Sequence, residues 1–171
     1  MTEHYIQQSI DTIYYSEMKR LHILLFISCA LSPSIGFALS ADAVEGKSLY
    51  PTCHVCHNPE ADPPLGPPMW GVQRRYKRST IDDEDFIKSM VDFVKRPTLE
   101  NARHDMAVEQ MGLMPPLPLP DEILEKIATY ILEEDFPPPC AHWAIAVKRA
   151  KEKGDTEHAK KDQRMLDRFC D

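Results

Sequence analysis

Two cysteines and a histidine stand close together in the first third of the chain, and they constrain the fold more than any other feature. Cys53 and Cys56 are separated by two residues, and His57 follows directly. This spacing places the two thiols about one turn of chain apart, with the imidazole projecting from the next position. The surrounding sequence must therefore enclose whatever group these three side chains hold together.

The order Cys-x-x-Cys-His is typical of c-type haem attachment, in which each thiol forms a thioether with a vinyl group and the histidine binds the iron. A zinc site would need two further ligands, and His54 lies too close to Cys53 and His57 to complete a tetrahedron easily. A thiol–disulfide redox pair would follow a strand, and no strand pattern precedes Cys53. We therefore expect one covalently bound haem c, with Cys53 and Cys56 as attachment points and His57 as an axial ligand of its iron.

A second axial ligand is expected from the Pro-rich segment that follows Met111. Met114 is followed directly by two prolines, which keep the segment out of a helix and restrict its path. A stiff loop of this kind can deliver a thioether, so Met114 is the predicted sixth ligand. Met111 and Met106 remain alternatives, although we expect both to pack in the core against the haem face. His104 would instead give a bis-histidine site with a lower reduction potential.

Several segments, taken in order, resemble the class I cytochromes c, which are small all-helical single-haem electron carriers. The resemblance covers about residues 43–136. Its segments are Gly46 and Tyr50 before the cysteines, Leu65–Arg75, Gly112–Pro115, and Asp121–Leu132 with its Tyr130-Ile131 pair. The resemblance implies an all-α class I cytochrome c fold around one covalently attached haem, followed here by a C-terminal helical extension.

The same resemblance assigns roles to residues around the haem. It implies that the carbonyl of Pro67 accepts a hydrogen bond from Nδ1 of His57, and that Arg75 lies near a haem propionate. It also places Tyr76 in the haem pocket, and Met69 at the proximal wall where the family usually has leucine. The segment between His57 and Leu65 departs from the family because it contains three prolines and no glycine.

Hydrophobic periodicity predicts helices through most of the chain, and no alternating strand pattern of useful length occurs. Thr80 is expected to cap one of these helices and Asp121 another, while Pro97 and the prolines at 137–139 act as stops. The expected helices are Val44–Tyr50, Asp82–Lys95, Thr98–Gln110, Asp121 to about Leu132, Ala141–Lys153 and Asp155–Phe169. Tyr130 is expected to pack against the first of them, where Gly46 permits close approach.

The first forty residues have the layout of a secretory signal peptide. Lys19 and Arg20 precede an apolar run over residues 21–27, and small residues follow further on. Cleavage is predicted after Ser40, with Ala41 and Ala43 as alternative positions. The polar residues before Met18 do not fit a signal peptide, which favours a true start at Met18.

Two other interpretations of this N-terminal segment remain open. An uncleaved segment would anchor the protein in the membrane facing the periplasm, and Cys29 weakly resembles a lipoprotein site. With cleavage, the protein is exported to the periplasm. We expect membrane contact only if the leader is retained.

The predicted organisation is an N-terminal extension at 1–40, a haem domain at 41–136 and a Pro-linked helical extension at 137–171. The haem domain is acidic, whereas residues 140–171 carry eight basic side chains against six acidic ones. Cys140 and Cys170 are the candidate disulfide, which an oxidising compartment would preserve and which could contribute about 3 kcal/mol. The extension either clasps its own domain or docks a partner.

These features predict an exported electron carrier with His and Met ligation, cycling between Fe(II) and Fe(III), and not an enzyme. The alternative is a cytochrome c subunit docked to a larger periplasmic or membrane oxidoreductase. A haem enzyme or gas sensor with an open iron position would require Met114 to be absent from the iron. The expected partners are redox proteins, for which the basic cluster at 74–78 is a candidate docking patch. The net charge of −7 argues against nucleic acid.

Overall fold

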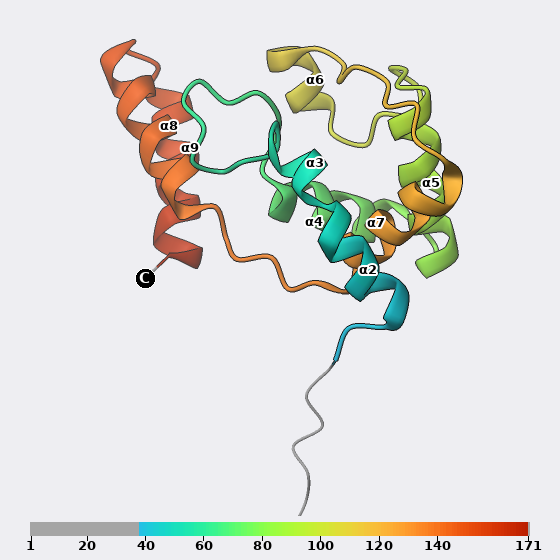
Figure 1. The fold of residues 1–171 in the computed structure, drawn as a ribbon. Helices are drawn as coiled ribbons and strands as arrows, with labels where there is room; N and C mark the ends of the chain where they lie inside the picture. Colours follow the sequence, from blue (N-terminus) through green and yellow to red (C-terminus); the bar gives the residue numbers. More distant parts are fainter. Residues whose placement is uncertain (1–37, 171) are drawn as a thin grey trace, which may run out of the picture. The chain divides into compact units, whose positions relative to one another are not determined.

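The computed structural model describes residues 38–170, and this part of the chain is helical without any strand (Figure 1). The all-α fold predicted from the sequence is therefore confirmed. None of these helices has the length and hydropathy needed to cross a bilayer. The signal peptide, the start at Met18 and the lipoprotein site at Cys29 lie outside the described residues. The helices are α2 (Ala41–Leu49), α3 (Pro51–His54), α4 (Met69–Ser79), α5 (Asp83–Lys95), α6 (Asp105–Met111), α7 (Asp121–Glu133), α8 (Cys140–Glu152) and α9 (Thr156–Phe169).

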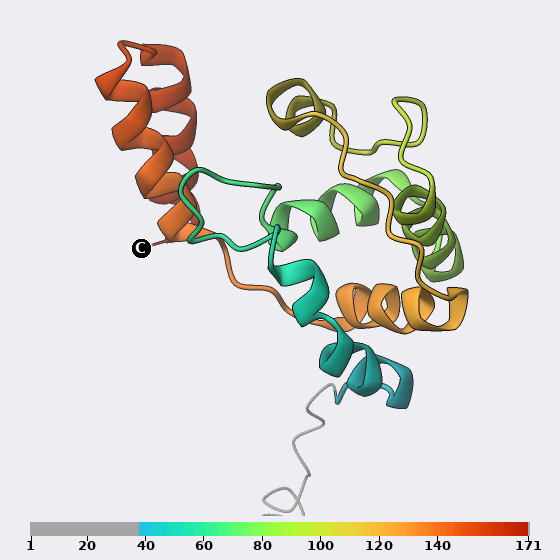
Figure 2. The same cartoon turned by 45° about the horizontal axis from the view of Figure 1, so that its top comes forward.

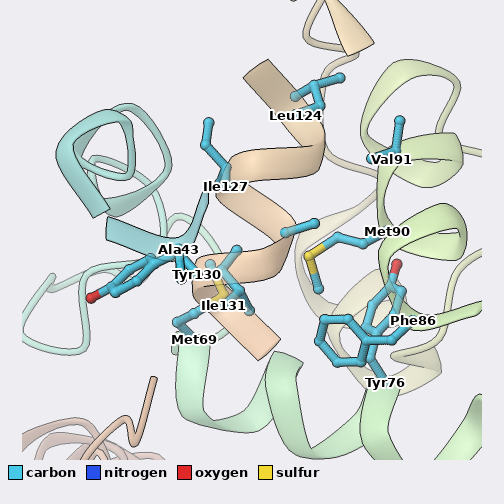
Figure 3. Packing of buried hydrophobic residues seen from close by; sticks show 11 residues of the cluster. Ala43, Met69, Tyr76, Phe86, Met90, Val91, Leu124, Ile127, Tyr130 and Ile131 are labelled. Atoms are coloured by element: carbon cyan, nitrogen blue, oxygen red, sulfur yellow. The ribbon is translucent and has the colours of Figure 1, made fainter. Parts of the chain in front are cut away.

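Helix α7 is the centre of the hydrophobic core and packs against α2, α4 and α5 (Figure 3). Its apolar residues recur at helical spacing, so one face of the helix is continuously buried. The core residues that α7 contributes are Leu124, Ile127, Ala128, Tyr130 and Ile131. Helices α4 and α5 meet through Tyr76 and Phe86, whose rings pack edge to face with centroids 5.6 Å apart. Several of these core residues also line the candidate site described below.

Helices α2 and α7 approach each other closely at Gly46. A Cβ atom at this position would lie 1.9 Å from the backbone oxygen of Lys126, so only glycine allows this contact. Tyr50 and Tyr130 also pack edge to face, with ring centroids 5.2 Å apart. The predicted packing of Tyr130 against the Gly46–Tyr50 region is therefore confirmed.

The N-cap residues of two helices differ from the predicted ones. Asp82, and not Thr80, caps α5, because its carboxylate accepts a hydrogen bond of 2.8 Å from the backbone N–H of Asp85. Thr80 instead lies at the end of α4, where its hydroxyl donates to the carbonyl of Tyr76 at 2.9 Å. Asp121 is the first residue of α7, and Pro120 occupies the cap position.

Ser40 caps α2, because its Oγ accepts a hydrogen bond from the backbone N–H of Ala43. The same hydroxyl donates to Oε1 of Glu133 at 2.7 Å. Cleavage after Ser40, as the sequence predicts, would remove this cap and its contact with α7. Helix α2 also begins three residues earlier than the predicted start at Val44.

Only the second half of the helix predicted over Thr98–Gln110 forms, as α6 over Asp105–Met111. Asn101 is the local reason, since its side chain accepts from the backbone N–H of Thr98 at 2.8 Å and donates to the carbonyl of Arg96 at 3.0 Å. These hydrogen bonds hold residues 96–101 in a turn that competes with helix. The turn brings the next residues, Arg103 and His104, beside α4.

Helix α4 was not predicted as a helix from the sequence. Met69, Gln73 and Tyr76 are its buried residues, and their spacing is that of one helical face. The side-chain amide of Gln73 donates to the carbonyls of Ile131 and Glu134, each at 2.6 Å. Gln73 therefore satisfies carbonyl groups at the C-terminal end of α7 that the helix itself leaves unpaired.

Helices α8 and α9 form an antiparallel hairpin that both views show side by side (Figures 1 and 2). The turn between them contains Gly154 at φ +73°, a conformation that favours glycine. Cys140 and Cys170 close the hairpin through a disulfide with a Cα–Cα distance of 5.8 Å. Trp70 of α4 packs edge to face on both Trp143 and Phe169, at centroid distances of 5.3 and 5.2 Å. The hairpin thus contacts its own domain through an aromatic cluster.

Candidate functional site

The two thiols and the imidazole are gathered on one turn of chain, as their spacing predicts. The backbone N–H groups of Cys56 and His57 both donate to the carbonyl of Cys53, at 3.2 and 3.1 Å. Cys53 is half-buried and Cys56 is exposed, and both are free thiols. Burial, together with the neighbouring Cys56, raises the pKa of the Cys53 thiol. Cys53, Cys56 and His57 all line the same cavity.

The ring of His57 is held by the backbone of Pro67. Nδ1 lies 2.6 Å from the Pro67 carbonyl oxygen, and since a carbonyl only accepts, Nδ1 carries the proton. Burial lowers the pKa of His57, the hydrogen bond to Pro67 opposes this, and His54 adds a smaller lowering effect. The imidazole is therefore neutral at neutral pH, and its Nε2 keeps the lone pair that a metal ligand needs.

Gly66 allows the loop between α3 and α4 to pass close behind the His57 ring. A Cβ at this position would lie 3.2 Å from the carbonyl oxygen of Cys56 and 3.4 Å from Nδ1 of His57. The loop reaches this position although prolines stand where the class I cytochromes c often have glycines. The departure in the loop sequence therefore leaves the Pro67–His57 contact intact.

A cavity of about 280 Å³ lies among α4, α5, α6 and α7, beside Cys53, Cys56 and His57. Its walls are mainly apolar, and among them are the core residues Met69, Met90, Leu124 and Ile131. An apolar cavity bordered by two free thiols and an imidazole with an available Nε2 fits the donor set of a covalently attached haem. Every predicted haem-pocket residue lines this cavity: Cys53, Cys56, His57, Pro67, Met69, Arg75, Tyr76 and Met114.

The segment after α6 is extended and is fixed to the core by its backbone. Gly112 ends α6 at φ +78°, and the N–H of Leu117 donates to the carbonyl of Val94 at 3.0 Å. Met114, which is half-buried, lies between these two points and lines the cavity. The loop is thus held at both ends, which limits where the Met114 sulfur can go.

The other candidate ligands have separate positions. Met111 and His104 also line the cavity. Met106 does not: it is 43% exposed, and its sulfur lies 3.4 Å from Nζ of Lys161 on α9. The expectation that Met106 packs in the core is therefore wrong, because α6 is short and turns this residue toward α9.

A group of polar side chains lies at one part of the cavity wall. Arg75 and Tyr76 come from α4, while Arg103 and His104 come from the segment just before α6. Burial raises the pKa of Tyr76, and Arg103 partly offsets the effect. Burial also lowers the pKa of His104, as does nearby Arg75. Arg103 was not identified from the sequence as a cavity residue. The only signal for it in the sequence is its position next to the candidate ligand His104.

The basic cluster at 74–78 is divided by the helix that carries it. Arg75 turns toward the cavity, whereas Arg74 is exposed and lies over the Trp70 ring at 4.6 Å from the ring centroid. Lys77 and Arg78 are exposed. Within residues 38–170, no three His, Cys, Asp or Glu side chains are grouped as ligands for a bare metal ion.

A comparison with curated proteins finds similarity to a protein of Synechocystis sp. named "Cytochrome c-553-like". The two sequences are 36% identical over 64 residues, which is 36% of this chain and 61% of that protein. The chain thus spans about three fifths of the length of this relative. No family model matches the chain, and no solved structure matches it. The similarity suggests a relationship to the cytochromes c.

Proposed function

We propose that this chain is an exported electron carrier that holds a single covalently attached haem c. Bound haem supplies a one-electron Fe(II)/Fe(III) couple, and no substrate bond is made or broken. The observation that carries the proposal is the 2.6 Å contact between His57 Nδ1 and the Pro67 carbonyl. It leaves Nε2 available for iron at an apolar cavity that two free thiols also border.

Each residue has a distinct role in this proposal. Cys53 and Cys56 would hold the macrocycle through thioether bonds, and His57 would bind the iron. Met114 would supply the second ligand to the iron, a role supported by its place in the fixed segment that follows Gly112. A thioether in this position raises the reduction potential relative to a second imidazole.

The remaining cavity residues control water and charge around the redox centre. Met69, Met90 and the core face of α7 exclude water, which reduces the reorganisation that accompanies a change in charge. Arg75 would lie near a propionate, because it is the cationic residue of α4 that turns toward the cavity.

The Cys140–Cys170 disulfide supports export, because structural disulfides persist in oxidising compartments such as the periplasm. Export follows if residues 1–40 act as a signal peptide, and retention of that segment would leave a membrane anchor. The partners would be a redox donor and a redox acceptor. Electron-transfer partners of this kind use small and short-lived contacts.

A second candidate function is a cytochrome c subunit of a larger oxidoreductase. The observation that favours it is the α8–α9 hairpin, which lies beyond the haem-binding helices and carries a net positive charge next to an acidic domain. Because the hairpin is positively charged, it could also serve as a docking element for an acidic partner. Stable co-purification of a redox enzyme, lost when residues 140–171 are deleted, would support this candidate over the free carrier.

The decisive experiment is a redox-titrated optical spectrum of the full chain, purified from cells competent for c-type maturation. We expect a six-coordinate c-type spectrum in both oxidation states and haem that stays on the chain through denaturing electrophoresis. A colourless protein, or haem that separates on denaturation, would contradict covalent attachment. Rapid carbon monoxide binding by the reduced protein would indicate an open iron position and favour a haem enzyme or gas sensor.

A further inference from the structure

Three buried polar atoms in the described part of the chain have no hydrogen-bond partner, and all three belong to residues that line the cavity. They are the hydroxyl of Tyr76, Nε of Arg103 and Nδ1 of His104. The Tyr76 side chain is the most enclosed, since the residue is only 4% exposed. A buried polar atom without a partner destabilises the fold, so three such atoms at one cavity indicate a group that satisfies them together.

The guanidinium of Arg103 contacts Ser89 through a terminal nitrogen, while its Nε is left unpaired. One terminal nitrogen lies 3.4 Å from the hydroxyl of Ser89, and that hydroxyl donates to Asp85 at 3.1 Å. Asp85 is the acid that faces Arg103, yet its carboxylate is already engaged by Ser89 and by the backbone N–H of Ile81. Within residues 38–170, neither Arg103 nor Arg75 forms an ion pair.

The charged groups that influence His104 are two cations and one exposed anion. His104 packs beside α4, where its Nε2 would lie 3.9 Å from a Cβ at Gly71. The positive charges of Arg75 and Lys161 lower the pKa of His104, and the negative charge of Asp105 raises it. The Asp105 side chain is exposed. The polar part of the cavity therefore offers the guanidinium groups of Arg75 and Arg103 and the hydroxyl of Tyr76 as donors, and it fits an anionic group with two oxygens.

We propose that Arg103, together with the hydroxyl of Tyr76, binds a carboxylate of the haem itself, with His104 beside them. This inference rests on the proposed haem function and extends it to residues of the 96–104 segment. The chemistry fits because a propionate brings two acceptor oxygens and a negative charge on the edge of an apolar ring. A free anion from solvent has the same chemistry, so the experiment must distinguish the two sources.

The test uses infrared difference spectroscopy between the oxidised and reduced states of the full holoprotein. Cells are fed 5-aminolaevulinic acid carrying 13C at its carboxyl carbon, because this label remains only in the propionate carboxylates of the finished haem. Bands that move to lower wavenumber with the label belong to the propionates. Arg103→Gln removes the proposed ion pair, and Tyr76→Phe removes only the hydroxyl and keeps the ring that packs on Phe86. Arg96→Gln is the matched control, because Arg96 is exposed and does not line the cavity.

We expect Arg103→Gln to shift the labelled bands and to lower the midpoint potential, since a positive charge beside the haem disfavours the oxidised, more positive iron. Tyr76→Phe should shift the same bands, and Arg96→Gln should leave both readouts unchanged. Labelled bands that stay in place in both cavity variants would overturn the proposal and leave a free anion as the occupant. Chains without any covalent haem would instead refute the proposed function, so the two failures are distinguishable.

Discussion

The carbonyl oxygen of Pro67 lies 2.6 Å from Nδ1 of His57, and this contact decides which ring nitrogen is available for a metal. The two residues are ten positions apart, and the loop that joins them passes Gly66 close to the His57 ring. A backbone acceptor cannot give up a proton, so the neutral tautomer is fixed with its lone pair on Nε2. Histidine ligation therefore depends on the loop as much as on His57.

Gly66→Ala should weaken this arrangement. The new methyl group would lie 3.2 Å from the Cys56 carbonyl oxygen and 3.4 Å from the His57 ring, so the loop or the ring must move. We expect a loss of about 1–3 kcal/mol in the free energy of unfolding and a lower yield of holoprotein. Gly71→Ala is the control, since its nearest neighbour would be 3.9 Å away and alanine favours helix. Equal stability of the two variants by chemical denaturation would contradict the prediction.

Replacing both Cys53 and Cys56 with alanine should abolish covalent haem, because no other free cysteine occurs within residues 38–170. Haem staining after denaturing electrophoresis gives the measurement. The apoprotein should also be poorly folded, as the cavity of about 280 Å³ loses the group that fills it. Circular dichroism compares the variant with the holoprotein. Haem staining equal to that of the wild type would disprove the attachment sites.

Met114→Ala should lower the midpoint potential and open the iron to carbon monoxide, because the thioether ligand favours Fe(II) over Fe(III). Redox titration and loss of the long-wavelength methionine–iron charge-transfer band provide the measurements. Met106→Ala is the matched control, since Met106 is 43% exposed and does not line the cavity. An unchanged potential in Met114→Ala would transfer the ligand role to Met111 or His104, which also line the cavity.

Gly46→Ala should destabilise the packing of α2 on α7. Its methyl group would lie 1.9 Å from the Lys126 carbonyl oxygen, which belongs to the backbone and cannot move without shifting a helix. We expect a loss of at least about 1–3 kcal/mol in the free energy of unfolding. Val44→Ala on the same helix should change stability by only about 0.5 kcal/mol, because Val44 is 58% exposed. Urea denaturation of both variants tests the difference.

Replacing Cys140 and Cys170 with serine should loosen the α8–α9 hairpin without changing the haem spectrum. The disulfide joins residues 30 positions apart, and closing a loop of this size contributes about 3–4 kcal/mol by the chain-entropy estimate. Hydrogen exchange should become faster in α8 and α9, while α2 and α7 keep their protection. Alkylation of both cysteines in the native wild-type protein would show that the disulfide does not form.

Local sequence patterns were sufficient where the structure depends on neighbouring residues. The helical spacing of apolar residues predicted α5, α7, α8 and α9 to within a few positions. The all-α fold followed from these helices. By contrast, α4 was missed because its buried face is short and includes Gln73, whose burial depends on carbonyl groups at the distant end of α7.

Boundaries were predicted less well, because competing local hydrogen bonds decide them. The expected helix over Thr98–Gln110 shortens to Asp105–Met111 since Asn101 holds a turn around Thr98. Thr80 ends one helix and does not begin the next, since its hydroxyl reaches the carbonyl of Tyr76. In both cases a polar side chain forms hydrogen bonds with the backbone that compete with the predicted helix. The sequence pattern alone does not show which set of hydrogen bonds is more stable.

The sequence by itself determined the chemistry of the candidate site, because a thiol–thiol–imidazole group on one turn is a local arrangement that needs no distant contact. It also indicated which segment carries the Met114 thioether. Only the tertiary structure decided that Arg103 and His104 join Arg75 and Tyr76 at one cavity. Their meeting depends on the turn at Asn101 and on the packing of that segment beside α4, and contacts between segments distant in sequence leave no periodic signal.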